Sequence, residues 1–317
     1  MTRNDWKDYS LYLFVRLIVC LLQALPLENG VQLARGAGWL AGRLLRSRQK
    51  IVLDNLAHAY PKLSAKERKN LAQEMWSHLF LSILESALAP RKIHETNWRQ
   101  YIDFTNDEGL MQFYLEGRAV LLTSAHFGNF ELANYAIGIR GLTTHAVARP
   151  FDNPYLHRFV NQFRRGTGQV VISKYGSYRE VPEILNNGGV MVFLADQSAG
   201  PKGCWVDFFG RPASTQPVVA RLSKKHDAPI VVGYARRTRP MHFELCIHAT
   251  ADPRQPVVSD NRTEELTQWY TSRLEECIRL APEQYWWLHR RWKDKRELHR
   301  DHLKRFLFFK EARGRFT

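Results

Sequence analysis

The chain has 317 residues, a formal net charge of +15 and a hydrophobic content of 44%. This length fits one large domain or two small ones, and the surplus of positive charge indicates anionic partners: nucleic acid, acidic lipid headgroups or an acidic carrier protein. The four cysteines are Cys20, Cys204, Cys246 and Cys277. They lie far apart without a C-x-x-C pair, which argues against a zinc site and against a disulfide framework.

The N-terminal part of the chain contains a continuous apolar segment. Residues 11–27 are almost all apolar, with Arg16 near one end. As a helix they span about 25 Å, slightly less than the roughly 30 Å core of a bilayer. A membrane anchor, a signal peptide and a buried core helix are all open. We favour membrane association, and note that no small-x-small cleavage site precedes Pro26.

Basic residues that follow this segment indicate its orientation. They are Arg35, Arg43, Arg46, Arg48 and Lys50. The positive-inside rule therefore places the bulk of the chain in the cytoplasm. We assign residues 1–48 to an N-terminal membrane anchor or amphipathic segment, and residues 49–317 to a single α/β domain.

The next segments are predicted to be helical and then to alternate between strands and helices. Residues 49–90 form two helices broken at Tyr60-Pro61, and the second opens with a capping box of Ser64 and Glu67. Residues 97–104 form a short strand. Further helices are expected at 107–117, 130–140, 153–165, 177–187, 215–226 and 262–280, and strands at 119–124, 143–148, 169–172, 190–195, near 205–208, 229–236 and 241–248.

This alternation predicts a mostly parallel central sheet covered by helices on both faces, the α/β class. The chain contains no G-x-G-x-x-G, no G-x-x-x-x-G-K-[ST], no H-E-x-x-H and no G-x-S-x-G. Dinucleotide-binding, P-loop, zinc-protease and serine-hydrolase functions are therefore disfavoured. The basic and aromatic tail from residue 290 to 315 is expected either at a membrane interface or packed on the domain.

A histidine lies where the strand at 119–124 ends. The following helix starts at Phe130, so His126 is at the sheet edge where ligands bind in open α/β folds. Glu131 lies in the first turn of that helix, and we expect its carboxylate to hold one ring nitrogen while the other faces solvent. This arrangement suits a general base that acts on a hydroxyl, although a plain polar contact or helix cap is the alternative.

The sequence around this histidine resembles a known motif. His126-Phe-Gly-Asn-Phe-Glu131 is similar to the H-x4-[D/E] motif of glycerolipid-type acyltransferases, in particular the late acyltransferases of lipid A biosynthesis. Three further blocks agree in order: Arg149-Pro150; Asp196-Gln197 with Gly203, Val206, Phe208-Phe209-Gly210, Ala213 and Thr215; and residues 282–293. The resemblance implies transfer of an acyl group from a thioester to a hydroxyl, with His126 as general base and Glu131 orienting it.

Residues at turns and strand ends are predicted to bind the substrates. The backbone N–H groups of Gly128 and Asn129 are candidate donors to a tetrahedral oxyanion. Arg149 is expected to bind a phosphate or the oxyanion, with a surface salt bridge as the alternative. Asp196, followed by Gln197, either orients Arg149 or a substrate hydroxyl, or caps the loop.

The pocket wall and the partners follow mainly from the resemblance. Phe209, Gly210 and Thr215 are expected to shape a wall of the pocket. The favoured donor is acyl carrier protein, an acidic partner that suits the basic surface, with acyl-CoA as the alternative. The expected acceptor is an anionic glycolipid of the lipid A precursor type. Residues 216–221 depart from the usual family sequence, which leaves a lysophospholipid or an amino-lipid open as the acceptor.

Two further expectations concern location and function class. The resemblance implies the bacterial inner membrane, with the catalytic domain on its cytoplasmic face. We expect no metal, no cofactor beyond the thioester co-substrate, and no nucleic-acid partner, since no nucleic-acid-binding motif is present. A non-catalytic membrane-binding scaffold of the same fold is the remaining alternative.

Overall fold

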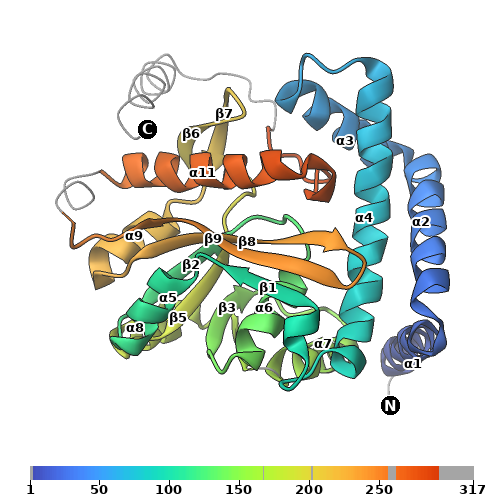
Figure 1. The fold of residues 1–317 in the computed structure, drawn as a ribbon, viewed down its shortest axis with the longest axis horizontal. Coiled ribbons are helices and arrows are strands. Elements are labelled where there is room, and N and C mark those ends of the chain that lie inside the picture. Colours follow the sequence, from blue (N-terminus) through green and yellow to red (C-terminus); the bar gives the residue numbers. More distant parts are fainter. Residues whose placement is uncertain (1–2, 167, 201–202, 256–261, 293–317) are drawn as a thin grey trace.

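A seven-stranded sheet with the spatial order β1-β9-β8-β2-β5-β3-β4 forms the centre of the protein (Figure 1). The computed structural model describes residues 3–166, 168–200, 203–255 and 262–292. The strands of the sheet are β1 (Ile102–Thr105), β2 (Val120–Ser124), β3 (Thr144–Ala148), β4 (Gln169–Ser173), β5 (Val190–Leu194), β8 (Ile230–Arg239) and β9 (His242–Ala251). Neighbours pair in parallel, except for the antiparallel pair β8 and β9. The predicted α/β class with a mostly parallel sheet is confirmed.

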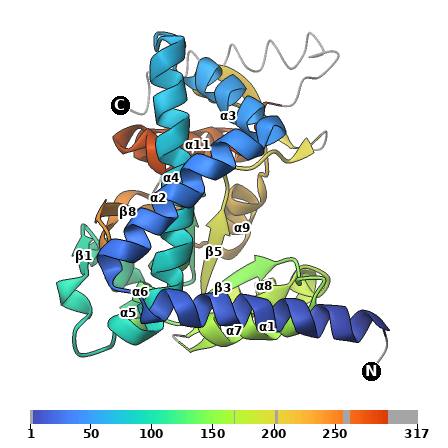
Figure 2. The same cartoon turned by 90° about the vertical axis from the view of Figure 1, so that its right-hand side faces the viewer.

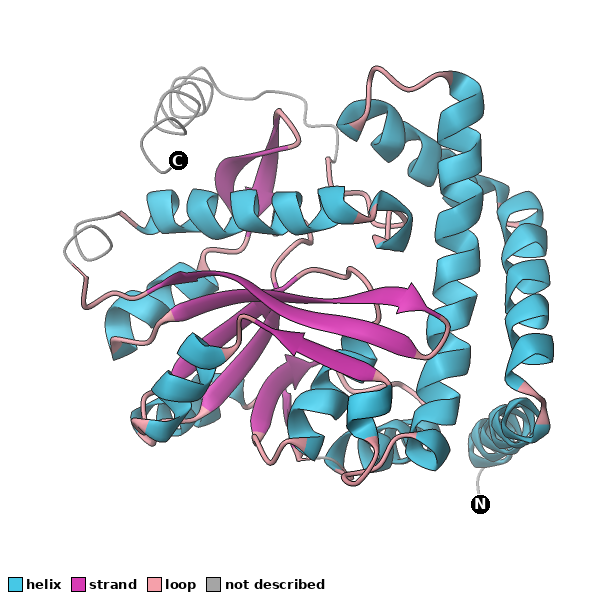
Figure 3. Ribbon diagram, in the orientation of Figure 1, coloured by secondary structure: helices cyan, strands magenta, loops and turns pink. Residues whose placement is uncertain are grey.

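Helices cover both faces of the sheet because both faces are apolar (Figure 3). Successive strand residues point to opposite sides, so Leu121 and Met191 belong to one buried cluster, and Leu122 and Val192 belong to the other. The first face is covered by α8 (Ser177–Asn186), α9 (Val218–His226) and α11 (Thr263–Leu280), and the second by α5 (Glu108–Leu115), α6 (Phe130–Ile139) and α7 (Pro154–Arg165). Burial on both sides explains the continuous apolar runs that predicted these strands.

The helices that precede the sheet pack against its side. They are α1 (Arg3–Ala24), α2 (Leu27–Leu44), α3 (Arg46–Ala59) and α4 (Ala65–Lys92). The predicted capping box of Ser64 and Glu67 is present at the start of α4. α2 crosses α4 at an angle (Figure 2), and the two backbones approach so closely that a Cβ at Gly38 would be 2.7 Å from the backbone nitrogen of Ser77.

The predicted N-terminal apolar helix is present as α1. Its side chains Leu13, Phe14, Leu17 and Leu21 are between 49% and 59% exposed. Within the described ranges, no helix combines the length and the apolar character needed to cross a bilayer. Membrane association of residues 1–48, and their separation from residues 49–317, stay predictions.

The main difference from the predicted elements is an antiparallel hairpin outside the sheet. Its strands are β6 (Cys204–Phe208) and β7 (Arg211–Thr215), and β7 is not predicted from the sequence. The helix predicted at 215–226 begins only after Pro217, which forms its N-cap. The segment predicted as a strand at 97–104 contains the 3₁₀ helix η1 (Trp98–Gln100) before β1. The basic tail from residue 293 onward lies outside the described residues.

Candidate active site

The carboxyl ends of β2 and β5 bring a histidine and an aspartate together. These strands are parallel neighbours, and Ser124 of β2 pairs with Leu194 of β5. His126 and Asp196 each lie two residues beyond this pair, so both emerge at the same edge of the sheet. The Nδ1 atom of His126 is 2.9 Å from Oδ1 of Asp196. The sheet-edge position predicted for both residues is confirmed.

Burial and charge in this pair determine where the proton lies. The side chain of Asp196 is 2% exposed and that of His126 is 15% exposed. Burial lowers the pKa of His126, but the charge and hydrogen bond of Asp196 outweigh it and raise this pKa above its ordinary value. Burial raises the pKa of Asp196, and His126 more than reverses this effect. Asp196 thus holds a proton on Nδ1 and leaves Nε2 to accept one.

Aromatic rings and an amide surround the imidazole. The ring centres of Phe130 and Trp286 lie 5.1 and 5.5 Å from that of His126. The side-chain Nε2 of Gln197 is 3.3 Å from Nε2 of His126, and Gln197 is exposed. A hydroxyl that approaches the imidazole must therefore displace the Gln197 amide.

The predicted contact between Glu131 and the ring of His126 is wrong. Both ring nitrogens have other partners, and Glu131 instead forms a two-pronged ion pair with Arg164 of α7. The reason is the direction of α6, which presents Phe130 rather than Glu131 to the imidazole. Beside the larger effects of burial and Asp196, the Glu131 charge makes a smaller contribution that raises the pKa of His126.

The turn between β2 and α6 is built around Gly128. This residue has φ +62°, and a Cβ on it would lie 1.6 Å from the carbonyl oxygen of Ala235. Its N–H donates to the carbonyl of Gln284 in the 3₁₀ helix η3 (Pro282–Gln284) at 2.9 Å, and the N–H of Asn129 donates to that of Ala235 at 3.0 Å. Both predicted oxyanion donors are therefore already used. The predicted role is wrong, and the two residues instead fix the turn.

Arg149 follows β3 and shares the sheet edge with His126 and Asp196. Its side chain is 66% exposed, and its guanidinium lies 3.0 Å from the carboxylate of Asp152. This is the surface salt bridge that the sequence left as the alternative. A role for Arg149 in binding a phosphate stays a prediction.

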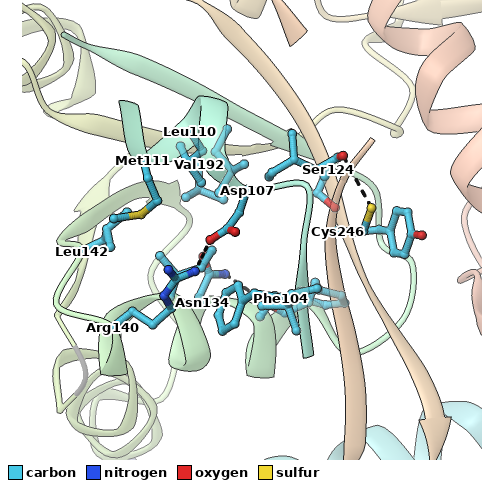
Figure 4. A pocket seen from close by; sticks show the side chains of 18 of the residues that line it. Phe104, Asp107, Leu110, Met111, Ser124, Asn134, Arg140, Leu142, Val192 and Cys246 are labelled. Carbon is cyan, nitrogen blue, oxygen red and sulfur yellow. Dashed lines mark hydrogen bonds and ion pairs between the residues drawn. The ribbon is translucent and has the colours of Figure 1, made fainter. Parts of the chain in front are cut away.

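An apolar cavity runs between the sheet and α6 (Figure 4). The centre of a water-sized sphere can move through about 60 Å³ of this cavity. Its lining includes one face of α6 and residues of the central strands: Phe130, Ala133, Asn134, Ile137, Arg140, Leu122 and Val192. The α6 residues span about 15 Å along the helix. Phe130, which touches His126, lines one end, and the ion pair of Asp107 with Arg140 lines the other.

Three predicted pocket residues lie elsewhere. Phe209 is buried in the hairpin turn, where its ring centre is 5.6 Å from that of Trp287. Gly210 completes this turn with φ +75°. Thr215 is fully buried and accepts a hydrogen bond from Arg291. The predicted pocket wall is therefore wrong for this cavity, because these residues pack the hairpin against the aromatic interior.

A buried arginine that no sequence pattern singles out supports the loop after β5. Arg291 is 2% exposed and donates to the carbonyls of Ser214 at 2.6 Å and Gln197 at 3.3 Å, and to the hydroxyl of Thr215. It thereby ties the hairpin to the loop that carries Asp196. The signal that could have found Arg291 is its place inside the C-terminal block of the resemblance.

These features are those of an α/β enzyme in which a polarised histidine contacts Phe130, a residue that lines an apolar cavity. Among the residues that the structure describes, no group of three or more His, Cys, Asp or Glu side chains is placed to hold a metal ion.

Comparison with known proteins specifies the class. The family described as "Bacterial lipid A biosynthesis acyltransferase" matches residues 3–294. The chain is 25% identical over 287 residues to the lipid A biosynthesis lauroyltransferase of Escherichia coli (strain K12), covering 88% of this chain and 90% of that protein. It is 26% identical to the palmitoleoyltransferase of the same strain, covering 81% and 82%, and 24% identical to the myristoyltransferase, covering 79% and 77%. The chain belongs to this family and is an acyltransferase of lipid A biosynthesis.

Proposed function

We propose that this enzyme transfers a fatty acyl group from acyl carrier protein to a hydroxyl of a lipid A precursor. The observation that carries the proposal is the hydrogen-bonded pair of His126 and Asp196, with the His126 ring against Phe130, a residue that lines the apolar cavity. An acyl chain in the cavity places its thioester carbonyl at the Phe130 end, next to the imidazole. Acidic carrier protein suits the charge of +15.

In this proposal, His126 acts as the general base. Asp196 retains the proton on Nδ1, and Nε2 takes the proton of the acceptor hydroxyl while the oxygen attacks the thioester carbon. The charges of Asp196 and Glu131 stabilise the imidazolium. Collapse of the tetrahedral intermediate breaks the carbon–sulfur bond, and the imidazolium returns its proton to the leaving thiolate. No acyl-enzyme is needed.

The side-chain amide of Gln197 is the proposed donor to the oxyanion. It lies 3.3 Å from the base in the free enzyme, in the position that the acceptor hydroxyl must take. Once the acceptor hydroxyl has displaced it, the amide can donate a hydrogen bond to the oxygen of the thioester carbonyl. Removal of one such donor typically lowers kcat by about 10²- to 10³-fold.

Arg149 at the same edge suits an anionic acceptor. Within the described part of the chain, the one ion pair of Arg149 is with an exposed carboxylate three residues away, a type of ion pair that water weakens. A phosphate group of the acceptor can compete for this guanidinium and form charge-assisted hydrogen bonds with it.

Exposed apolar faces on the N-terminal helices support a location on the membrane. Leu13, Phe14 and Leu17 of α1 and Leu40 and Leu44 of α2 are exposed, and both helices lie on the same side of the molecule (Figure 2). Amphipathic helices bury such faces at the boundary between headgroups and acyl chains. With the basic residues that follow α1, this favours the cytoplasmic face of the bacterial inner membrane.

The test is acyl transfer by the detergent-solubilised protein. Acyl carrier protein and CoA thioesters are offered with a lipid A precursor or a lysophospholipid, and His126→Ala is assayed in parallel. His226→Ala is the matched control, because His226 ends α9 at the opposite edge of the sheet. We expect transfer from the carrier protein to the lipid A precursor, reduced about 100-fold or more in His126→Ala. A His126→Ala enzyme with full activity would refute the assigned base, and exclusive use of the other substrates would refute the assigned donor or acceptor.

A further inference from the structure

A buried polar network lies behind the turn that carries His126. His78, Ser82 and Glu85 lie on one face of α4, and Arg237 of β8 contacts all three. The side chain of Arg237 is 8% exposed and that of Glu85 is 1% exposed. None of these residues lines the cavity along α6, and the proposed chemistry uses none of them.

The contact with Arg237 decides which nitrogen of His78 carries the proton. The guanidinium NH1 of Arg237 is 2.5 Å from Nδ1 of His78. Arginine can only donate hydrogen bonds, so Nδ1 must accept and the ring proton lies on Nε2. That Nε2 lies 3.2 Å from the carbonyl oxygen of Gly128 and donates to it.

The same network holds the next residue of the turn. Glu85 accepts from Nε and NH2 of Arg237, both at 2.6 Å, and from the side-chain amide of Asn129 at 3.2 Å. The Asn129 amide also donates to the carbonyl of Ser82 at 3.3 Å. The backbone carbonyl and side-chain oxygen of Asn129 accept from the N–H groups of Ala133 and Leu132 in α6. With the bonds described above, every polar group of Gly128 and Asn129 is therefore engaged.

We propose that His78 is a positioning residue, which sets the geometry of His126 through the carbonyl of Gly128. His126 lies only two residues before Gly128, and its 2.9 Å contact with Asp196 depends on the place of this backbone. Without the bond from His78, a buried carbonyl lacks its donor and the turn relaxes. A displacement of about 1 Å in a catalytic group can lower the rate about 100-fold.

Two substitutions separate the two bonds of His78. In His78→Gln, the amide nitrogen takes the place of Nε2 and can still donate to Gly128. In His78→Asn, the shorter amide places its oxygen near the position of Nδ1, so it can still accept from Arg237 but does not reach Gly128. The pair therefore isolates the bond to the turn.

Two readouts distinguish positioning from a general effect on folding. Steady-state acyl transfer gives kcat and KM, and NMR of ¹³C-histidine-labelled protein gives the titration of His126, assigned with His126→Ala. In His78→Asn we expect kcat to fall ten- to a hundredfold with KM unchanged, on the order expected for a misplaced base. The pKa of His126 moves down as its contact with Asp196 loosens. In His78→Gln we expect kcat and the pKa of His126 to stay close to their wild-type values.

The activity readout rests on the proposed function, whereas the titration does not. A wild type without transferase activity would overturn the proposed function, and the titration would still decide the role of His78. Wild-type behaviour of His78→Asn, or a loss of kcat with an unchanged titration of His126, would overturn the positioning role. If His78→Asn does not fold, His78→Met replaces it with the same expectations, since methionine fills a similar space without a donor.

Discussion

Substitution of Asp196 by asparagine removes the charge beside His126 and keeps the size of the side chain. Burial alone lowers the pKa of His126, and Asp196 reverses this effect through its charge and its hydrogen bond. In Asp196→Asn, burial still lowers the pKa of His126, but the carboxylate that opposed this effect is gone. The pKa of His126 therefore falls, and no carboxylate holds the Nδ1 proton or stabilises the imidazolium.

The expected loss in kcat/KM is on the order of 10²- to 10⁴-fold, the range seen for general bases and for the orienting carboxylate of a catalytic triad. This corresponds to about 3–5 kcal/mol in the transition state. The acid limb of the pH profile of kcat/KM reports the pKa of the base in the free enzyme. We expect this limb to move to lower pH in Asp196→Asn while the plateau falls.

The assay is acyl transfer across the pH range, with Asp152→Asn as the matched control because the Asp152 side chain is 90% exposed. Glu131→Gln is expected to lose less activity than Asp196→Asn, since Glu131 makes only the smaller contribution to the pKa of His126. A wild-type plateau and acid limb in Asp196→Asn, or a larger loss in Glu131→Gln, would refute the reasoning.

The same pair has a signature in stability. The pKa of Asp196 is lowered and that of His126 is raised in the fold. The pair therefore stabilises the fold most between the ordinary values of about 3.9 and about 6.5. The difference in melting temperature between wild type and Asp196→Asn should be largest there. It should narrow as pH falls through the lowered pKa of Asp196 or rises through the raised pKa of His126, and a difference independent of pH would contradict this.

Three further predictions concern the turn, the cavity and the N-terminal helix. Gly128→Ala is expected to cost about 3 kcal/mol or more in thermal unfolding, because its Cβ has no space, whereas Gly36→Ala in α2, with open space around it, should stabilise by about 0.5–1 kcal/mol; equal effects would contradict the close approach. Ile137→Trp should fill the middle of the cavity and shift the preferred donor to a shorter acyl chain in a competition assay, and an unchanged preference would show that the chain binds elsewhere. Joint replacement of Phe14 and Leu17 by Asp should weaken sedimentation with anionic vesicles by tenfold or more, since burial of each apolar side chain contributes about 1.5–3 kcal/mol. Unchanged sedimentation would exclude this face of α1 from the membrane contact.

The sequence is sufficient to place His126 and Asp196 at one edge of the sheet. The apolar runs before His126 and Asp196 identify β2 and β5, and a parallel sheet puts both strand ends at one edge. The hydrogen-bond partner of His126 cannot be predicted from the sequence in the same way. Glu131 is near in sequence, but the true contact depends on the pairing of Ser124 with Leu194 across 70 residues, which local patterns do not encode.

The hairpin residues show a second reason why sequence patterns mispredict parts of the site. Phe209 and Thr215 lie in one of the sequence blocks that resemble the late acyltransferases of lipid A biosynthesis, and such a resemblance does not distinguish a residue that touches the substrate from one that supports the site. The structure shows that Thr215 accepts a hydrogen bond from Arg291. The same guanidinium also donates to the carbonyl of Ser214 in β7 and to that of Gln197 in the loop after β5. Such support is visible only once the hairpin, α11 and the C-terminal segment are packed together.

The most direct test of acyl transfer at this site is a crystal structure with a non-reactive donor, in which a methylene group replaces the thioester sulfur. We expect the acyl chain to lie in the cavity along α6, with its carbonyl carbon next to Nε2 of His126 and its oxygen near the amide of Gln197. A chain bound outside this cavity, or a carbonyl group out of reach of His126, would contradict the assignment of this site.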